Sequence, residues 1–176
     1  MEQLTPVAKK FILHWGEMGA RWGINRTVAQ VHALLFISQM PLNAEQLTQL
    51  LGVARSNVST SLRELQSWGI VRIVHVMGDR RDHFESIKDV WDLFRQVLDE
   101  RKRREIDPTV ALLKECVAEA RQSGPAEKYP RQKLAELLDF FQATTAWYEQ
   151  IRRMPTAAVV RFVGLGDRVR KLLGVG

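Results

Sequence analysis

The chain has 176 residues, of which 45% are hydrophobic and 26% charged, so it is long enough for one globular domain, alone or with an appended helical region. Its net charge of +6 favours a polyanionic partner, although a merely basic globular protein has the same charge. The single cysteine excludes an internal disulfide and disfavours a cysteine-based metal site, and no stretch reads as a signal peptide or a membrane span, so we expect a cytoplasmic protein.

The first predicted element is a helix over residues 4–22. Its apolar stripe follows a 3.6-residue period and consists of Phe11, Trp15, Met18 and Trp22. Gly16 and Gly19 lie inside this helix, where each glycine costs about 1 kcal/mol relative to alanine. Such glycines indicate the close approach of another backbone, and we expect that crossing in a dimer interface.

Two helices and a turn come next. Asn25 is placed to cap a helix over 26–39, and Asn43 with Gln46 forms a predicted capping box at the start of a helix over 44–51. A glycine turn at Gly52 then leads to a further helix.

That helix covers 55–68 and buries one stripe, which consists of Val58, Leu62 and Leu65. Residues 70–77 and 83–87 are predicted as the two strands of a hairpin around a turn at 78–82. The order of helix, helix, turn, helix and hairpin predicts a winged helix-turn-helix over residues 26–87.

Residues 88–176 read as helical. The predicted helices cover 88–105, from Asp107 and Pro108 to about 122, and 131–153, with the pair Asp107-Pro108 as the cap and first residue of a new helix. A basic cluster follows in the tail, at Arg168, Arg170 and Lys171. The predicted fold is therefore mainly α with a small β-hairpin wing. Residues 1–25 and 88–176 form the helices outside the DNA-binding domain, and we expect them to hold a homodimer together.

The outward face of the 55–68 helix is the candidate for reading double-stranded DNA in the major groove. Its members are small, polar or basic: Arg55, Ser56, Asn57, Ser59, Thr60 and Arg63. The alternative is the ordinary polar face of a surface helix.

The predicted wing favours DNA binding over an ordinary polar helix face. It carries Arg72 on a strand and Arg80 and Arg81 in the turn, where basic side chains can reach phosphates or the minor groove. Asp79 and Asp82 either orient these arginines or belong to a solvated turn.

The sequence resembles the MarR-type winged-helix regulators, and in particular their GbsR-like branch. The resemblance is carried by residues 47–69 (LTQLLGVARSNVSTSLRELQSWG), 78–85 (GDRRDHFE) and the Val90-Trp91 pair. It implies a homodimer that represses or activates promoters, often under a small-molecule effector, and we expect a repressor. Ala54 departs from the pattern, because many relatives have a capping serine there.

No sequence pattern indicates an enzyme, a cofactor or a metal site, since there is no phosphate loop and no metal-type cluster. Cys116 reads as a small buried residue rather than a redox sensor, and the charge run from Glu100 to Glu105 reads as a solvated helix face. A winged helix that binds only proteins is the alternative function. Five aromatic residues outside the DNA-reading unit form either packing surfaces or a cage for a quaternary ammonium effector such as choline, to which the resemblance points: Trp15, Trp22, Trp91, Trp147 and Tyr148.

Overall fold

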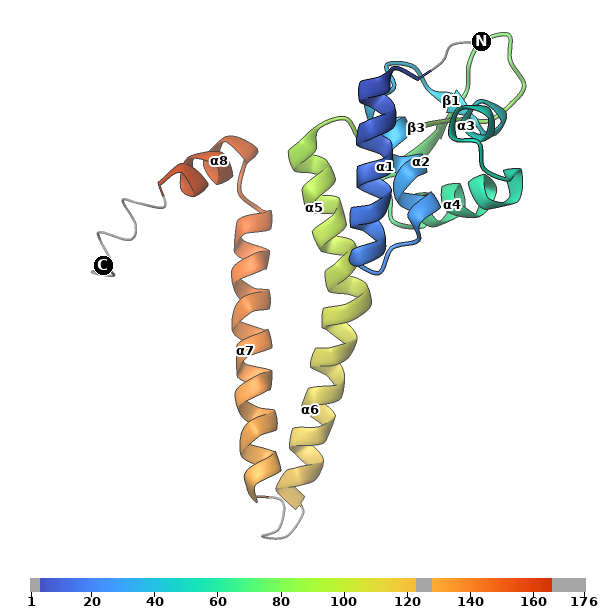
Figure 1. Cartoon of the computed structure of the whole chain (residues 1–176). Helices are drawn as coiled ribbons and strands as arrows, with labels where there is room; N and C mark the ends of the chain where they lie inside the picture. Colours follow the sequence, from blue (N-terminus) through green and yellow to red (C-terminus); the bar gives the residue numbers. More distant parts are fainter. Residues whose placement is uncertain (1–3, 123–127, 166–176) are drawn as a thin grey trace. The chain divides into compact units, whose positions relative to one another are not determined.

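The structure, a computed structural model, describes residues 4–122 and 128–165 (Figure 1). The chain divides into two compact units, Met1–Val97 and Leu98–Gly176, and the division falls inside helix α5 (Val90–Arg101). Among the described residues, no helix combines the length and the apolar character needed to cross a membrane.

The first unit has the element order of a winged helix, with one additional helix at its start. Its elements are α1 (Pro6–Arg21), α2 (Arg26–Ile37), β1 (Leu42–Asn43), α3 (Ala44–Leu51), α4 (Arg55–Ser67), β2 (Val71–Val74) and β3 (His83–Ser86). The predicted mainly helical fold with a small wing is confirmed.

The predicted helix starts are confirmed by their caps. The Asn25 side chain accepts a hydrogen bond from the Thr27 N–H, at 2.8 Å. Asn43 and Gln46 exchange hydrogen bonds in a reciprocal capping box at the start of α3, at 3.0 and 2.9 Å. At Ala54 no side chain caps α4, as its sequence implies.

Helix α2 lies at the centre of the core and packs on α1, α3, α4 and β3. The buried stripe predicted for α4 is confirmed, and it meets Leu34, Leu35 and Leu47 in one apolar cluster. Burial of these side chains fixes the orientation of α4, so its opposite face must point outward.

The predicted apolar stripe of α1 is not its buried face within the chain. The buried residues are instead Ile12, Gly16 and Gly19, while Trp15 and Trp22 are 40% and 62% exposed. Glycine decides this, because α2 approaches so closely that a Cβ at Gly19 would lie 2.5 Å from the Cβ of Ala29. The expected close crossing therefore exists, but it joins α1 to α2 of the same chain rather than to a second copy.

The sheet has three antiparallel strands in the order β1-β3-β2, where a two-stranded hairpin was expected. Leu42 pairs with Phe84 and Asn43 with His83, so residues next to the α3 cap also extend the wing. The wing hairpin itself is in register from Val71 with Ser86 to Val74 with His83. Helix α3 and the wing are thus joined through β1.

The second unit is helical. After the end of α5 it contains a π-helical segment, η1 (Lys102–Ile106), then α6 (Asp107–Gln122), α7 (Lys128–Arg152) and α8 (Thr156–Gly164). Helices α6 and α7 pack side by side as a hairpin (Figure 1). Helix α7 begins three residues before the expected start, and the basic cluster at 168–171 lies outside the described residues.

The expected helix restart at Asp107 and Pro108 is wrong. The Asp107 N–H donates to the Lys102 carbonyl oxygen, and Asp107 has helical dihedral angles, so the helix continues through a π turn. Proline lacks an N–H and its ring crowds the preceding turn, and the wider π turn accommodates both effects without a break. The Asp107 carboxylate accepts from the Lys102 ammonium at 2.8 Å instead of capping the helix.

Candidate nucleic-acid interface

The outer face of α4 carries most of the polar residues expected there. Of the six candidates, Ser59 is half-buried and five are exposed: Arg55, Ser56, Asn57, Thr60 and Arg63. Arg63 lies one turn after Thr60, and its guanidinium donates a long hydrogen bond of 3.4 Å to the Thr60 hydroxyl. This face has the composition and the narrow side chains that a major-groove surface needs.

Two glycines set the ends of this helix. Gly52 has a φ of +66° in the turn between α3 and α4, and Gly69 has a φ of +70° just after α4. The Gln96 side-chain amide of α5 donates to the Trp68 carbonyl oxygen at 2.9 Å, so α5 holds the last turn of α4. The last turn of the helix is therefore held by α5.

The wing arginines differ in their surroundings. Arg72 pairs across the hairpin with Glu85, whose carboxylate accepts from the Arg72 Nε at 2.6 Å. Arg80 has neither an ion-pair nor a hydrogen-bond partner in the part of the chain that the structure describes. Arg80 is thus the wing cation that is available without breaking an existing contact.

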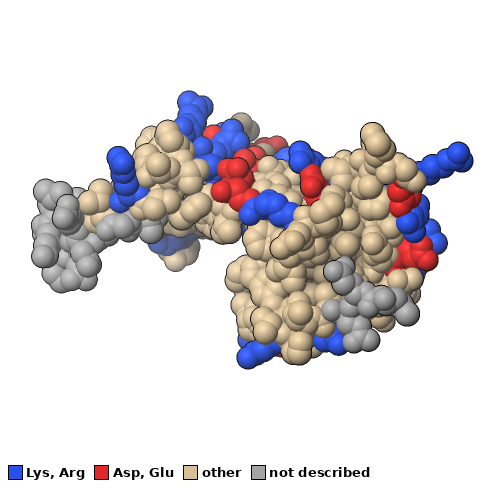
Figure 2. Space-filling model, turned by 90° about the horizontal axis from the view of Figure 1, so that it is seen from above, with Lys and Arg blue, Asp and Glu red and all other residues tan. Residues whose placement is uncertain are grey.

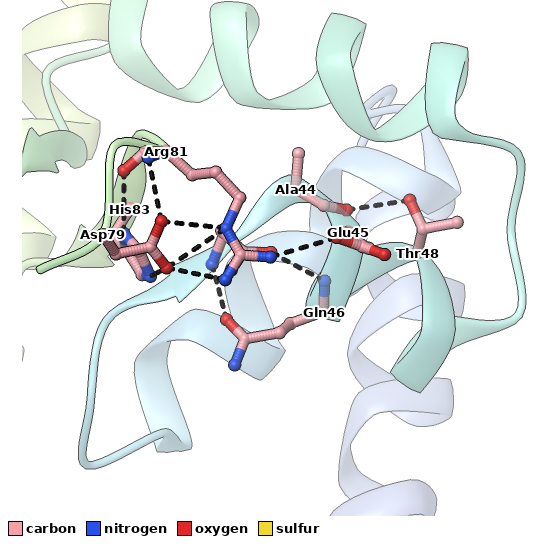
Figure 3. A network of polar contacts seen from close by, with 8 residues as sticks. Ala44, Glu45, Gln46, Thr48, Asp79, Arg81 and His83 are labelled. Carbon is pink, nitrogen blue, oxygen red and sulfur yellow. Dashed lines mark hydrogen bonds and ion pairs between the residues drawn. The ribbon is translucent and has the colours of Figure 1, made fainter. Parts of the chain in front are cut away.

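Arg81 lies at the centre of a polar network (Figure 3). Its guanidinium donates to both Asp79 carboxylate oxygens, at 2.6 and 2.9 Å, and to Glu45 of α3 at 3.1 Å. Its backbone N–H donates to Asp79 as well, at 3.0 Å. Of the two interpretations of Asp79, orientation of an arginine is confirmed, and the link from Arg81 to α3 is an addition.

The same network includes His83, which is buried at the start of β3. Its Nδ1 lies 3.0 Å from the Arg81 carbonyl oxygen and its Nε2 lies 3.6 Å from an Asp79 carboxylate oxygen. The hydrogen bonds donated by Arg81 hold the pKa of the Asp79 carboxyl well below its usual range, and they raise the pKa of Arg81 in turn. The Asp79 carboxyl therefore stays ionised beside Arg81 to lower pH than an isolated carboxyl does.

On the face shown in Figure 2, basic groups do not form one continuous patch. In the face shown in Figure 2, Lys and Arg side chains are interspersed with acidic ones and separated by wide neutral areas. In the wing turn, Arg80 and Arg81 are balanced by Asp79 and Asp82. Attraction to DNA must therefore come from particular side chains rather than from a broad positive field.

Lys88 makes a contact with the end of α2 that the sequence did not predict. Its ammonium donates to the carbonyl oxygens of Leu35 and Ser38, both at 2.6 Å, at the end of α2. Burial lowers the pKa of Lys88. A cation at a helix C-terminus stabilises the exposed carbonyl groups, so Lys88 fastens the end of the wing to the core.

The five candidate aromatic residues have separate surroundings. Trp15 packs beside Phe11, with ring centroids 5.4 Å apart, and Trp91 meets the edge of Phe94 at 6.5 Å. In the second unit, the Tyr148 hydroxyl donates to Asp99 at 2.7 Å. Desolvation and this hydrogen bond raise the pKa of Tyr148.

A cavity of about 350 Å³ lies at the base of the wing and offers no aromatic cage. It is lined by residues 69–72, 85–89 and 92, and none of the five aromatic candidates is among them.

Within the described residues, no group of three or more His, Cys, Asp or Glu side chains is placed to hold a metal ion. Cys116 is half-buried on α6.

The charge run at the end of α5 is not wholly solvated. Glu100 is buried and accepts from Arg103 at 2.6 Å, and it also pairs with Arg104. The three side chains lie three and four residues apart on successive turns, where such pairs meet. The exposed members of the run are Arg103, Arg104 and Glu105.

Comparison with known proteins agrees with this geometry. Residues 22–82 match the family model described as MarR family. The matched segment runs from the end of α1 to the wing turn. The chain is also 19% identical over 149 residues to the HTH-type transcriptional repressor GbsR of Bacillus subtilis (strain 168). The aligned region covers 81% of this chain and 82% of that protein.

Two solved structures are similar to this chain. A crystal structure of a transcriptional regulator has a TM-score of 0.58 at 20% identity, covering 82% of this chain and 99% of the other, and supports the fold. Transcriptional regulator Tm0710 from Thermotoga maritima aligns over 84% of this chain and 92% of its own at 16% identity, with a TM-score of 0.39. The predicted resemblance to MarR-type regulators is confirmed, and these matches point to a regulator rather than an enzyme.

Proposed function

We propose that the protein represses transcription by binding double-stranded DNA, with α4 in the major groove and the wing beside it. The observation that carries this proposal is the division of α4 into a fully buried apolar face and an exposed polar face with two arginines, Arg55 and Arg63. The similarity to a repressor, GbsR, favours repression over activation. In the wing, Arg80 contacts a phosphate, while Arg81 holds the turn and reaches DNA only if it leaves Asp79.

The test is a DNA-binding titration at several salt concentrations, with random and selected duplexes. A DNA-binding regulator should prefer some sequences and lose affinity steeply as salt rises. Arg80→Ala should reduce the salt dependence, whereas Arg81→Ala should weaken binding with a smaller change in that dependence. If the protein binds no duplex at low salt, the alternative of a winged helix that binds only proteins gains instead.

We also propose a homodimer. One recognition helix covers too few base pairs for tight specific binding, and paired half-sites supply the rest. Support comes from large apolar side chains left exposed outside α2–β3: Trp22 at the C-cap of α1, Phe94 on α5, and Phe140 and Trp147 on α7. Sedimentation at micromolar concentration should give about twice the chain mass of 20.2 kDa, and a monomer that binds an operator tightly would contradict the proposal.

A quaternary ammonium effector is the remaining part of the proposal. Trp22 and Trp147 each expose about 60% of their surface, and an indole face attracts such a cation by about 0.5–2 kcal/mol. Calorimetry with choline, glycine betaine and 3,3-dimethylbutanol, the uncharged isostere of choline, tests this interpretation. Equal binding of choline and the isostere, or no binding below millimolar concentration, would leave the aromatic residues as packing surfaces.

A further inference from the structure

The apex of the wing is an apolar side chain. The Asp79 N–H donates to the Val76 carbonyl oxygen at 3.1 Å, which closes a four-residue turn over 76–79. Gly78 has a φ of +85°, the positive value that a type II turn requires at its third residue. Met77 therefore occupies the corner of the turn, and its side chain is fully exposed.

This apex has a fixed support. The carboxylate of Asp79, the last residue of the turn, accepts from the Arg81 guanidinium and backbone N–H, and the Arg81 guanidinium also donates to Glu45 of α3. Below the turn, Val74 is paired with His83 in the hairpin. Because the turn is bonded to the same helix-turn-helix that presents α4, Met77 keeps a set position relative to the recognition helix.

The charges around the apex leave an apolar contact as its main contribution. The turn holds two arginines and two aspartates, so it has no net charge with which to release counterions from DNA. Arg80 has no ion-pair or hydrogen-bond partner within the described chain. An exposed methionine beside one available cation matches the side chains with which minor-groove proteins pry base steps apart and contact the flanking phosphate.

We infer that Met77 is a minor-groove wedge that reads DNA by deformability. Resting on the proposed DNA binding, this inference places the methionine at a base step beside the site read by α4, with Arg80 on the adjacent phosphate. The wedge partly unstacks that step and bends the duplex. It therefore selects flexible pyrimidine–purine steps, which are the easiest to unstack, at a position where no side chain reads a base edge.

The experiment selects bound duplexes from a random-sequence pool with the wild-type protein and with Met77→Ala. Met77→Leu keeps an apolar wedge of similar size, and Met40→Ala removes another exposed methionine, before β1 and away from the turn. Affinity for the selected duplex, its salt dependence, and DNA bending by the mobility of circularly permuted fragments are measured for each protein.

We expect Met77→Ala to bind the selected duplex roughly tenfold more weakly, about the effect of one mismatched base pair. It should also lose the flanking preference and reduce the bend, while the salt dependence stays as in the wild type. Met77→Leu and Met40→Ala should behave like the wild type. If Met77→Ala selects the same flanks with the same affinity and bend, the wedge is wrong and DNA binding stands; if the wild type binds no duplex, both proposals fail.

Discussion

Replacing Gly19 with alanine tests how closely α1 is seated on α2. A Cβ at this position would lie 2.5 Å from the Cβ of Ala29 on the facing helix. Since two carbon atoms are in optimal contact at about 3.5–4.0 Å, the helices would have to separate by roughly 1 Å. Ala29 has no side-chain torsion that could relieve the contact, so the backbone must move.

Two opposing contributions set the size of the effect. Overpacking a tight interface costs about 1–3 kcal/mol, whereas alanine stabilises a helix interior by about 1 kcal/mol relative to glycine. We expect Gly19→Ala to lower the free energy of unfolding by up to about 2 kcal/mol, the difference between these two contributions.

Gly16→Ala is the matched control, because Gly16 is also buried in α1. Its added Cβ would meet the Gln30 Cγ at 2.7 Å, but the Gln30 side chain can rotate away, so the substitution should be neutral or slightly stabilising. In the Gly19→Ala background, Ala29→Gly removes the clashing atom. The two changes should therefore show a favourable coupling of about 1 kcal/mol in a double-mutant cycle.

The assay is urea unfolding followed by tryptophan fluorescence, since Trp15 lies on α1 and Trp22 at its C-cap. All variants are compared at one protein concentration, because a dimer makes the unfolding midpoint depend on concentration. The close crossing of α1 and α2 would be refuted if Gly19→Ala were as stable as Gly16→Ala, or if the coupling with Ala29→Gly were absent.

Three further predictions concern the interface and the core. Arg63→Ala should weaken binding to a selected duplex by about 1–3 kcal/mol, with altered base preference if Arg63 reads a guanine; unchanged titrations would show that this face of α4 does not contact DNA. Glu45→Gln should weaken DNA binding if the contact with Arg81 positions the wing. Stronger binding would mean that the contact with Glu45 had kept Arg81 from binding a DNA phosphate. Burial, with a smaller effect of Lys88, lowers the pKa of His32 to about 4, so the folded state binds its proton less readily than the unfolded chain does. Its contribution to stability, up to about 3 kcal/mol, is present above pH 6.5 and lost as the pH falls toward 4, so His32→Leu should flatten the decline in unfolding free energy over that window; a decline as steep as in the wild type would contradict this.

The features that the sequence predicted well depend on short-range chemistry. The capping box at Asn43 and Gln46 and the end of α4 at Gly69 involve groups within a few residues of each other. The polar face of α4 follows from the same 3.6-residue period as its buried face, so locating one side locates the other. These rules also gave the order of elements, and hence the winged helix.

The features that it missed depend on partners far along the chain. Helix α1 has two stripes of small or apolar residues, and only the contact of Gly19 with Ala29 decides which one is buried. The hydrogen bond from Arg81 to Glu45 joins residues 36 positions apart, and no local sequence pattern predicts it. At Asp107, the Asp-Pro pair is an ordinary helix start by local rules, and the π turn that carries the helix through it depends on the hydrogen bond to Lys102.

The charge pattern of the described winged helix differs between the two parts proposed to contact DNA, α4 and the wing turn. Helix α4 carries Arg55 and Arg63 against one acid, Glu64, whereas the wing turn carries equal numbers of arginines and aspartates. Counterion release, which gives DNA binding its salt dependence, must then come mainly from α4 and its neighbours. A neutral turn that is bonded to α3 contributes by shape, because its position is fixed before DNA arrives and a deformable step can be fitted to it. Substitutions in α4 should therefore change both the salt dependence and the base preference, whereas Met77→Ala at the corner of the wing should change affinity, bending and the accepted flanking steps without changing the salt dependence.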